Sequence, residues 1–340
     1  MTVTVDVHAH VILPDVEAAV ADRPGLAAHK DLDARRNGAR SLAVSGQMVG
    51  ARIGKLTRVP VRLADMDAQG VDVQIVSPSP SHYHYWADAD LAREVWQLAD
   101  QGTAAHCAQA PGRLLGLGLA PLQHPAQLVE SLDHALDLGL KGVEISSHAP
   151  GVELSDPRLE PFWARAAVTG AVVFLHPFGC TLDERLDRWY LSNIVGQPAE
   201  NAVALSHLIF AGVLDRHPDL KLLASHGGGY LPTYIGRADH GWTVRSEAHD
   251  CAQPPSSYLR RIWFDSLVYT PTGLRHLAEA VGAHRLVLGS DYPFDMGVDN
   301  PLERLADAGF PPADELAIRG GTAASLFDLP APVPTRGARS

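Results

Sequence analysis

The residues best suited to chemistry are histidines and one aspartate that close short apolar runs. His8 and His10 end the run VDVHAH, and residues two apart on a strand point to the same side. His176 ends AVVFLH, His226 ends KLLASH and Asp291 ends RLVLGSD. Histidine is the commonest metal ligand and an acid or base near neutral pH. The five positions therefore predict a metal site with a proton-transferring group beside it.

We assign four of these residues to the metal. Three imidazoles and a carboxylate suit Zn²⁺, with Mn²⁺, Co²⁺ or Fe²⁺ as alternatives. One Zn²⁺ per subunit is predicted to bind His8, His10, His176 and Asp291. His226 is predicted to be a general acid or base, with a fourth nitrogen ligand as the alternative, and it forms the predicted catalytic pair with Asp291.

Eight short runs rich in β-branched residues are separated by helical patterns, and together they must position these side chains. Such alternation indicates a parallel sheet, and eight units indicate a closed (β/α)₈ TIM barrel of the α/β class. Barrel active sites lie at the carboxyl ends of the strands. Closure also places the eighth strand beside the first, so Asp291 can meet His8 and His10. The predicted strands are residues 3–7, 71–77, 114–119, 142–146, 171–175, 220–225, 262–267 and 285–289.

One stretch interrupts the alternation. Residues 14–61 are mixed and polar with short apolar pieces, and we predict that they form an inserted flap over the barrel mouth, with a small β-structure as one alternative. We expect residues 1–328 to form a single barrel domain that contains this flap. Residues 329–340 are rich in Pro, Arg and Ser and are expected to form a flexible tail.

Composition narrows the function classes. The 340 residues carry 28 Lys and Arg against 39 Asp and Glu, a net charge of −11, which argues against a nucleic-acid partner. No apolar run is long enough to span a membrane, and the first ten residues lack a signal-peptide pattern. Three widely spaced cysteines suggest a reducing compartment, so we expect a cytoplasmic protein without a membrane partner.

Several motifs together resemble the amidohydrolase superfamily. The nearer resemblance is to its branch of metal-dependent, non-oxidative decarboxylases typified by 2-amino-3-carboxymuconate-6-semialdehyde decarboxylase, and it extends over most of the chain. The motifs that carry it are His8-x-His10, His176-Pro177, Ser225-His-Gly-Gly-Gly229, Gly289-Ser-Asp-Tyr-Pro-Phe294, Asp65–Gln74, Pro198-Ala-Glu200, Ile235–Trp242 and Trp263-Phe-Asp-Ser266.

The resemblance implies residues for a small anionic carboxylate substrate. Arg237 and Arg245 stand where the family places carboxylate-binding arginines, and it implies a homodimer in which Arg237 reaches the partner's site. Exposed surface charge is the alternative for both residues. A flap arginine is also expected, and Arg52 is favoured over Lys55 and Arg58.

Aromatic residues are candidates for stacking on a planar substrate. Phe178 and Phe294 are predicted to do so, with lid packing as the alternative. The family has tryptophan where this chain has Asn193, and commonly where it has Phe178, and these differences fall on the substrate wall. His82 and His84 are expected to lie in a solvated loop.

The resulting hypothesis is a zinc-dependent non-oxidative decarboxylase of an unsaturated or aromatic carboxylic acid. The resemblance favours 2-amino-3-carboxymuconate-6-semialdehyde or a related ring-cleavage product. The alternative keeps the site but changes the reaction to hydrolysis of a lactone or amide, or to hydration of an unsaturated dicarboxylate. A non-catalytic binding barrel is a third hypothesis.

Overall fold

A computed structural model describes residues 3–329. In this structure all eight predicted runs form strands, and the strands close into the predicted barrel. The third run is interrupted at Leu117 and gives two short strands, β3 and β4. Pairing is parallel throughout the barrel, in the orders β1-β2-β3 and β4-β5-β8-β9-β10-β11. Val7 N–H donates to Leu288 O at 2.9 Å, which joins the last strand to the first. The strands are β1 Val5–Val11, β2 Val73–Pro78, β3 Leu114–Gly116, β4 Gly118–Leu119, β5 Gly142–Ile145, β8 Val172–Leu175, β9 Lys221–Ala224, β10 Trp263–Asp265 and β11 Leu286–Val287.

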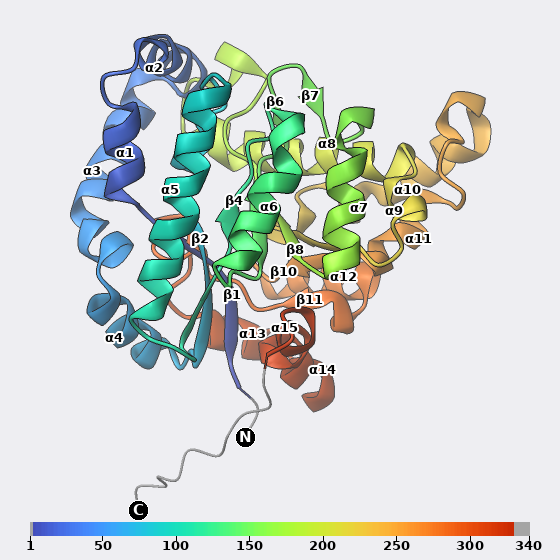
Figure 1. The fold of residues 1–340 in the computed structure, drawn as a ribbon. Helices are drawn as coiled ribbons and strands as arrows, with labels where there is room; N and C mark the ends of the chain where they lie inside the picture. Colours follow the sequence, from blue (N-terminus) through green and yellow to red (C-terminus); the bar gives the residue numbers. More distant parts are fainter. Residues whose placement is uncertain (1–2, 330–340) are drawn as a thin grey trace, which may run out of the picture.

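Helices surround this barrel, as the alternation predicts (Figure 1). Asp88 caps the helix after β2 by accepting Leu91 N–H at 3.0 Å, and Thr270 caps the helix after β10 through Gly273 N–H. The helices beyond residue 70 are α5 Ala89–Ala108, α6 Leu128–Asp137, α7 Glu160–Thr169, α8 Gln197–Phe210, α9 Val213–Arg216, α10 Leu231–Val244, α11 Pro255–Tyr258, α12 Pro271–Val281, α13 Pro301–Asp307, α14 Pro312–Leu316 and α15 Thr322–Leu326.

The barrel interior is apolar at the end where the strands begin. Val5, Ile75 and Leu223 form one cluster with Ala323 of α15 and with Phe327 just beyond that helix, and Phe174 of the same cluster lies against His8. Val3 and Leu329, the first and last described residues, pack against the same cluster. Within the described residues, polar side chains can therefore gather inside the barrel only at the opposite end, where the strands finish.

Residues 14–61 are mostly helical, so the alternative of a small β-structure is wrong. They form α1 Pro14–Val20, α2 Pro24–Asn37, α3 Ala39–Thr57 and the start of α4 Val59–Gln69. A proline opens α1 and α2, and another stands in the first turn of α4, where its missing N–H costs nothing. The apolar pieces at 42–44 and 47–49 lie on one continuous helix. The predicted boundary at 61 falls inside α4, and the flap role of α1–α3 stays a prediction.

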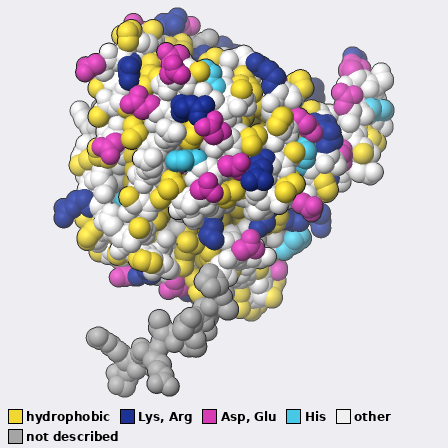
Figure 2. Space-filling model, in the orientation of Figure 1, with side chains coloured by type: hydrophobic (Ala, Val, Ile, Leu, Met, Phe, Trp, Pro, Cys, Tyr) yellow, Lys and Arg dark blue, Asp and Glu magenta, His cyan; other side chains and the backbone are white. Residues whose placement is uncertain are grey.

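The remaining features concern the surface and the ends. An unpredicted antiparallel hairpin, β6 His148–Ala149 and β7 Val152–Glu153, follows β5. None of the helices described has the length and apolar character needed to cross a bilayer. On the face shown in Figure 2, basic and acidic side chains are interspersed. Residues 330–340, most of the predicted tail, lie outside the described residues.

Candidate metal centre

The four predicted metal ligands meet at the carboxyl ends of the strands. His8, His10, His176 and Asp291 are all buried, and their ligand atoms lie within 4.8 Å of one another. His8 Nε2 lies 3.1 Å from His10 Nε2, and Asp291 Oδ1 lies 3.5 and 3.4 Å from these two nitrogens. Barrel closure thus brings together residues that are 281 or more positions apart in the sequence.

The donor set fits a divalent cation. Both ring nitrogens of His176 and Asp291 Oδ1 are buried with no hydrogen-bond partner among the described residues. Buried polar atoms rarely stay unpaired, because each costs free energy. The facing Nε2 atoms of His8 and His10 also present lone pairs to each other unless a cation or proton lies between them. Three imidazoles and one carboxylate are the donors expected for Zn²⁺ or a related transition metal.

Asp265, at the end of β10, is a functional residue that the sequence reasoning missed. His8 Nδ1–H donates to Asp265 Oδ2 at 2.6 Å, which directs His8 Nε2 toward the other ligands. The same carboxylate accepts the backbone N–H groups of His226 at 2.9 Å and Gly227 at 2.8 Å. Asp265 therefore positions a predicted metal ligand, His8, and the backbone of the predicted proton carrier, His226, together. Asp265 belongs to the motif Trp263-Phe-Asp-Ser266, but the role of Asp265 becomes clear only from these contacts.

We expect Asp265→Asn to weaken metal binding roughly 10- to 100-fold, because the amide replaces a charged acceptor beside His8. The measurement is the dissociation constant of Zn²⁺ in competition with a chromogenic chelator. Asp239→Asn, on α10 and away from the ligand set, is the matched control and should leave the constant unchanged. Equal affinity for Zn²⁺ in Asp265→Asn and the parent protein would contradict the assigned role.

A second buried network holds the strands that carry the ligands. The Asp6 carboxylate accepts His8 N–H at 3.2 Å and Ser290 Oγ–H at 2.6 Å, so it connects β1 with the segment that leads to Asp291. Gln74 donates to Asp6, and Arg62 donates both to Gln74 Oε1 at 2.6 Å and to His10 O at 2.5 Å. The pKa of the fully buried Arg62 is lowered to about 10 by burial.

The pKa values of the ligand set show which charges interact. Burial would lower the pKa of His8, but the charge of Asp291 and the bond to Asp265 raise it to about 9. Burial would raise the pKa of Asp291, but His8 and His10 hold it below its usual value. Burial and the neighbouring imidazoles lower the pKa of His176, so that it stays neutral. A neutral imidazole and an ionised carboxylate are the protonation states that bind a metal, so His176 and Asp291 already have the required form, whereas His8 must release its proton when a metal binds.

His226 lies beside the four ligands, on a left-handed backbone with φ of 51°. Its ring centroid is 5.2 Å from that of His8 and 4.9 Å from that of His176. Burial and the His8 charge lower the pKa of His226 to about 4, so the ring is neutral at physiological pH. Ser225 Oγ lies 3.2 Å from His226 Nδ1, while Nε2 has no hydrogen bond within the described residues.

Of the predicted substrate residues, Phe294 lies beside a predicted ligand, while Arg52 and Phe178 contact residues next to the ligand set. Arg52 of α3 donates from Nη1 to the carbonyl oxygens of Pro293 at 2.6 Å and Phe294 at 3.0 Å. The Phe294 ring is 5.3 Å from the His10 ring. Phe178 is 40% exposed and contacts Tyr83, whose hydroxyl donates to Glu144 Oε1 at 2.7 Å.

The other two predicted substrate residues are not brought to the ligand set. Arg237 is exposed on α10. Arg245 follows the end of that helix and its Nε donates to Glu247 at 2.8 Å. A role for either residue would need a second subunit or a movement of this segment. Their substrate contacts therefore stay predictions.

His82 and His84 are buried, which corrects the expectation of a solvated loop. His82 Nε2 accepts Leu13 N–H at 3.0 Å, and His82 Nδ1 lies 3.2 Å from Glu17 Oε1. A ring nitrogen that accepts an N–H is unprotonated, so the ring proton is on Nδ1, facing the carboxylate. His82 thus joins the 3₁₀ turn after β2 to the start of α1.

Comparisons with known proteins agree with this geometry. A family model described as amidohydrolase matches residues 5–329. The chain is 32% identical over 296 residues to the 2-amino-3-carboxymuconate-6-semialdehyde decarboxylase of Dictyostelium discoideum, covering 86% of this chain and 82% of the relative.

Two solved structures share the fold over nearly their whole length. The 5-carboxyvanillate decarboxylase of Sphingomonas paucimobilis superposes with a TM-score of 0.81 at 26% identity, covering 96% of this chain and 99% of that one. A dihydroxybenzoic acid decarboxylase of Polaromonas sp. JS666 has a TM-score of 0.81 at 21% identity, over 97% of this chain and 98% of the other. That structure contains manganese and the inhibitor 2-nitroresorcinol, and at this identity it supports the fold alone.

Proposed function

The chain belongs to the amidohydrolase family, and from that premise we propose that it is a metal-dependent, non-oxidative decarboxylase of an unsaturated or aromatic carboxylic acid. The observation that carries the proposal is the buried group of three histidines and one aspartate, with a neutral histidine beside it. The relatives named as decarboxylases support the reaction class. We further propose that the resident ion is Zn²⁺, held by His8, His10, His176 and Asp291, with Mn²⁺ as the first alternative.

The ion would act as a Lewis acid toward the oxygen atoms of the substrate. The protein's own groups would do the rest. Phe294 lies against His10 and offers a flat apolar face to a planar substrate, with Phe178 at the more exposed side. Arg52 is held by two carbonyl oxygens of the segment after Asp291, and its unused N–H groups could pair with a substrate carboxylate.

His226 would carry the proton. The bond between the substrate carbon and its carboxylate breaks, CO₂ leaves, and the electron pair stays on the carbon until a proton arrives. Asn201 Nδ2 donates to Ser225 O at 3.0 Å and lies 3.5 Å from Ser225 Oγ, so we propose that the serine proton points to His226 Nδ1 and that the ring proton is on Nε2. As Nε2 gives its proton to the carbon, Nδ1 would take up the Ser225 hydroxyl proton, and the serine would regain a proton from solvent, so that the ring ends neutral again.

A substrate panel tests this proposal. The holoenzyme is incubated separately with 2-amino-3-carboxymuconate-6-semialdehyde, 2,6-dihydroxybenzoate and 5-carboxyvanillate, and CO₂ is measured in the headspace. We expect saturable CO₂ release from the muconate semialdehyde, the favoured substrate. Release only from a hydroxybenzoate would keep the reaction but change the substrate, whereas turnover of a lactone without CO₂ would contradict the reaction class.

We also propose a homodimer in which Arg237 enters the partner's site, as its exposed position on α10 allows. Mixing two inactive variants, His226→Gln and Arg237→Gln, should then restore activity. In a mixed dimer one site has both a working His226 and the partner's Arg237. Random exchange between two-fold symmetric dimers predicts about a quarter of the parent activity. If Arg237 served its own subunit, or no site, the mixture would be no more active than the mean of the two variants.

A further inference from the structure

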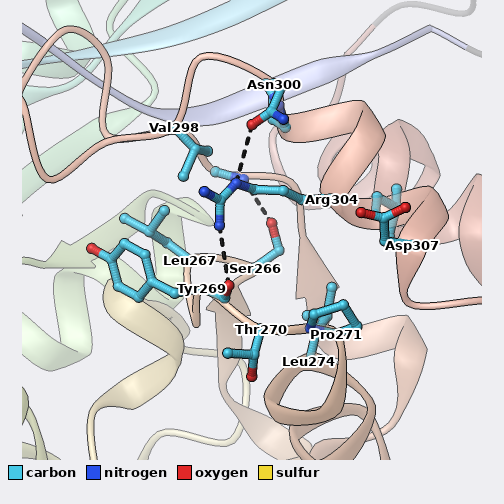
Figure 3. Close-up of a pocket in the computed structure, with 13 residues that line it drawn as sticks. Ser266, Leu267, Tyr269, Thr270, Pro271, Leu274, Val298, Asn300, Arg304 and Asp307 are labelled. Atoms are coloured by element: carbon cyan, nitrogen blue, oxygen red, sulfur yellow. Dashed lines mark hydrogen bonds between the residues drawn. The ribbon is translucent and has the colours of Figure 1, made fainter.

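A cavity lies beside the candidate metal centre, separated from it by Gly289. It has a volume of about 200 Å³, is partly open to solvent, and is lined by the loop after β10, the start of α12, the segment after β11, and α13 (Figure 3). Pockets for drug-sized ligands hold roughly 300–1,000 Å³, so a small molecule is the expected occupant. Its apolar walls include Leu267, Leu274, Val298 and Leu305.

Arg304 of α13 extends across this cavity (Figure 3). Its Nε donates to Asn300 Oδ1 and its Nη1 to Tyr269 O, both at 3.1 Å. Both acceptors are neutral, and within residues 3–329 no carboxylate oxygen lies within 4.0 Å of this guanidinium. A guanidinium has five N–H donors, so several remain for a ligand. The cavity therefore holds a guanidinium that is partly exposed, is positioned by two neutral oxygens and makes no ion pair within the described residues.

The remaining polar groups define the ligand further. Ser266 Oγ accepts Gly289 N–H at 3.2 Å, which leaves the serine proton available as a second donor. Asp307 also lines the cavity but does not pair with Arg304 (Figure 3). Its charge disfavours a dianion such as phosphate, and the apolar walls favour an organic acid. A singly charged carboxylate on a small apolar body matches both features.

The wall between this cavity and the metal centre is thin. Gly289 lines the cavity, and a Cβ added there would lie 2.8 Å from Asp265 Cβ and 3.1 Å from His8 Cβ. Tyr269 completes the wall in a left-handed conformation with φ of 63°, and its hydroxyl donates to Met296 O at 2.9 Å. The cavity is thus a neighbour of the metal centre with a separate set of lining residues.

We propose that this cavity is a second binding site, which takes a small monocarboxylate with an apolar body through Arg304 and Ser266. The site is distinct from the metal centre, and its existence does not depend on which reaction the metal centre catalyses.

Benzoate derivatives test the proposal on the holoenzyme. Binding of 4-fluorobenzoate is followed by ¹⁹F NMR in the parent protein, in Arg304→Gln and in Arg275→Gln. The last is a matched control, because Arg275 also donates to two neutral oxygens, Ala308 O and Thr272 Oγ1, but does not line the cavity. We expect Arg304→Gln to weaken one binding event about tenfold through loss of charge-assisted hydrogen bonds, with the control unchanged.

Crystals soaked in 4-bromobenzoate then locate the site by the anomalous signal of bromine. A peak in the cavity, with its carboxylate toward Arg304, supports the proposal. Bromine only at the metal centre, or binding that is equal in Arg304→Gln and the parent protein, overturns it. Displacement of 4-fluorobenzoate from this cavity by equimolar phosphate would overturn the preference for a monocarboxylate.

Discussion

Replacing His226 by glutamine is expected to lower kcat about 10²- to 10⁴-fold, the usual contribution of a positioned proton carrier. Glutamine keeps a polar side chain of similar length but cannot relay a proton. The metal content should stay at the parent level, because the ligand group comprises His8, His10, His176 and Asp291. The measurements are steady-state CO₂ release and metal analysis of the same preparation.

His276→Gln is the matched control for this prediction, since His276 is exposed on α12. It should leave both kcat and metal content unchanged. If His226→Gln lost its metal along with its activity, His226 would be a fourth nitrogen ligand, which was the alternative open from the sequence. Parent-like kcat in His226→Gln would contradict a role in proton transfer altogether.

The second large effect is expected from His176→Ala. Removing this imidazole leaves two histidines and one aspartate, so we expect loss of tight metal binding and activity at least about 10³-fold below the parent, since the Lewis acid is lost. The metal should also stabilise the folded parent protein, because an ion that binds only the folded state raises Tm. In His176→Ala, added Zn²⁺ should no longer raise Tm.

Differential scanning calorimetry with and without Zn²⁺ makes this comparison, with His276→Ala as the control. Both ring nitrogens of His176 lack a hydrogen-bond partner within the described chain, so the alanine variant loses packing but no protein hydrogen bond from the ring. A His176→Ala protein that still bound one equivalent of metal and showed the parent's shift in Tm would exclude His176 as a ligand.

The convergence of His8, His10, His176 and Asp291 could be predicted because two simple rules place them together. Alternation along a strand puts His8 and His10 on one side, and closure of the barrel brings Asp291 to them. Neither inference needs the detailed packing of side chains. The eight strands could also be predicted, because buried parallel strands are short apolar segments separated by helices.

Other features of the fold and the site could not be predicted from the sequence, and the physical reason differs for each. A single aspartate at a strand end, such as Asp265, is ordinary until its 2.6 Å contact with His8 is known. Arg62 lies on an amphipathic helix, where an arginine is normally exposed, and only the tertiary fold gives it Gln74 and His10 O as buried acceptors. The apolar pieces within residues 14–61 are too short to distinguish a helix from a strand by periodicity.

The metal-reconstituted enzyme in D₂O provides the most direct test of the central claim. Metal-free protein is titrated with Zn²⁺ or Mn²⁺, and CO₂ and the organic product are analysed after turnover of 2-amino-3-carboxymuconate-6-semialdehyde, or of the acid the panel identifies. The proposed function predicts that activity rises in proportion to bound metal up to one equivalent per subunit. It also predicts one CO₂ per substrate consumed and one deuterium on the carbon that carried the carboxylate. Turnover by metal-free protein, or a product that gains solvent oxygen without release of CO₂, would contradict it.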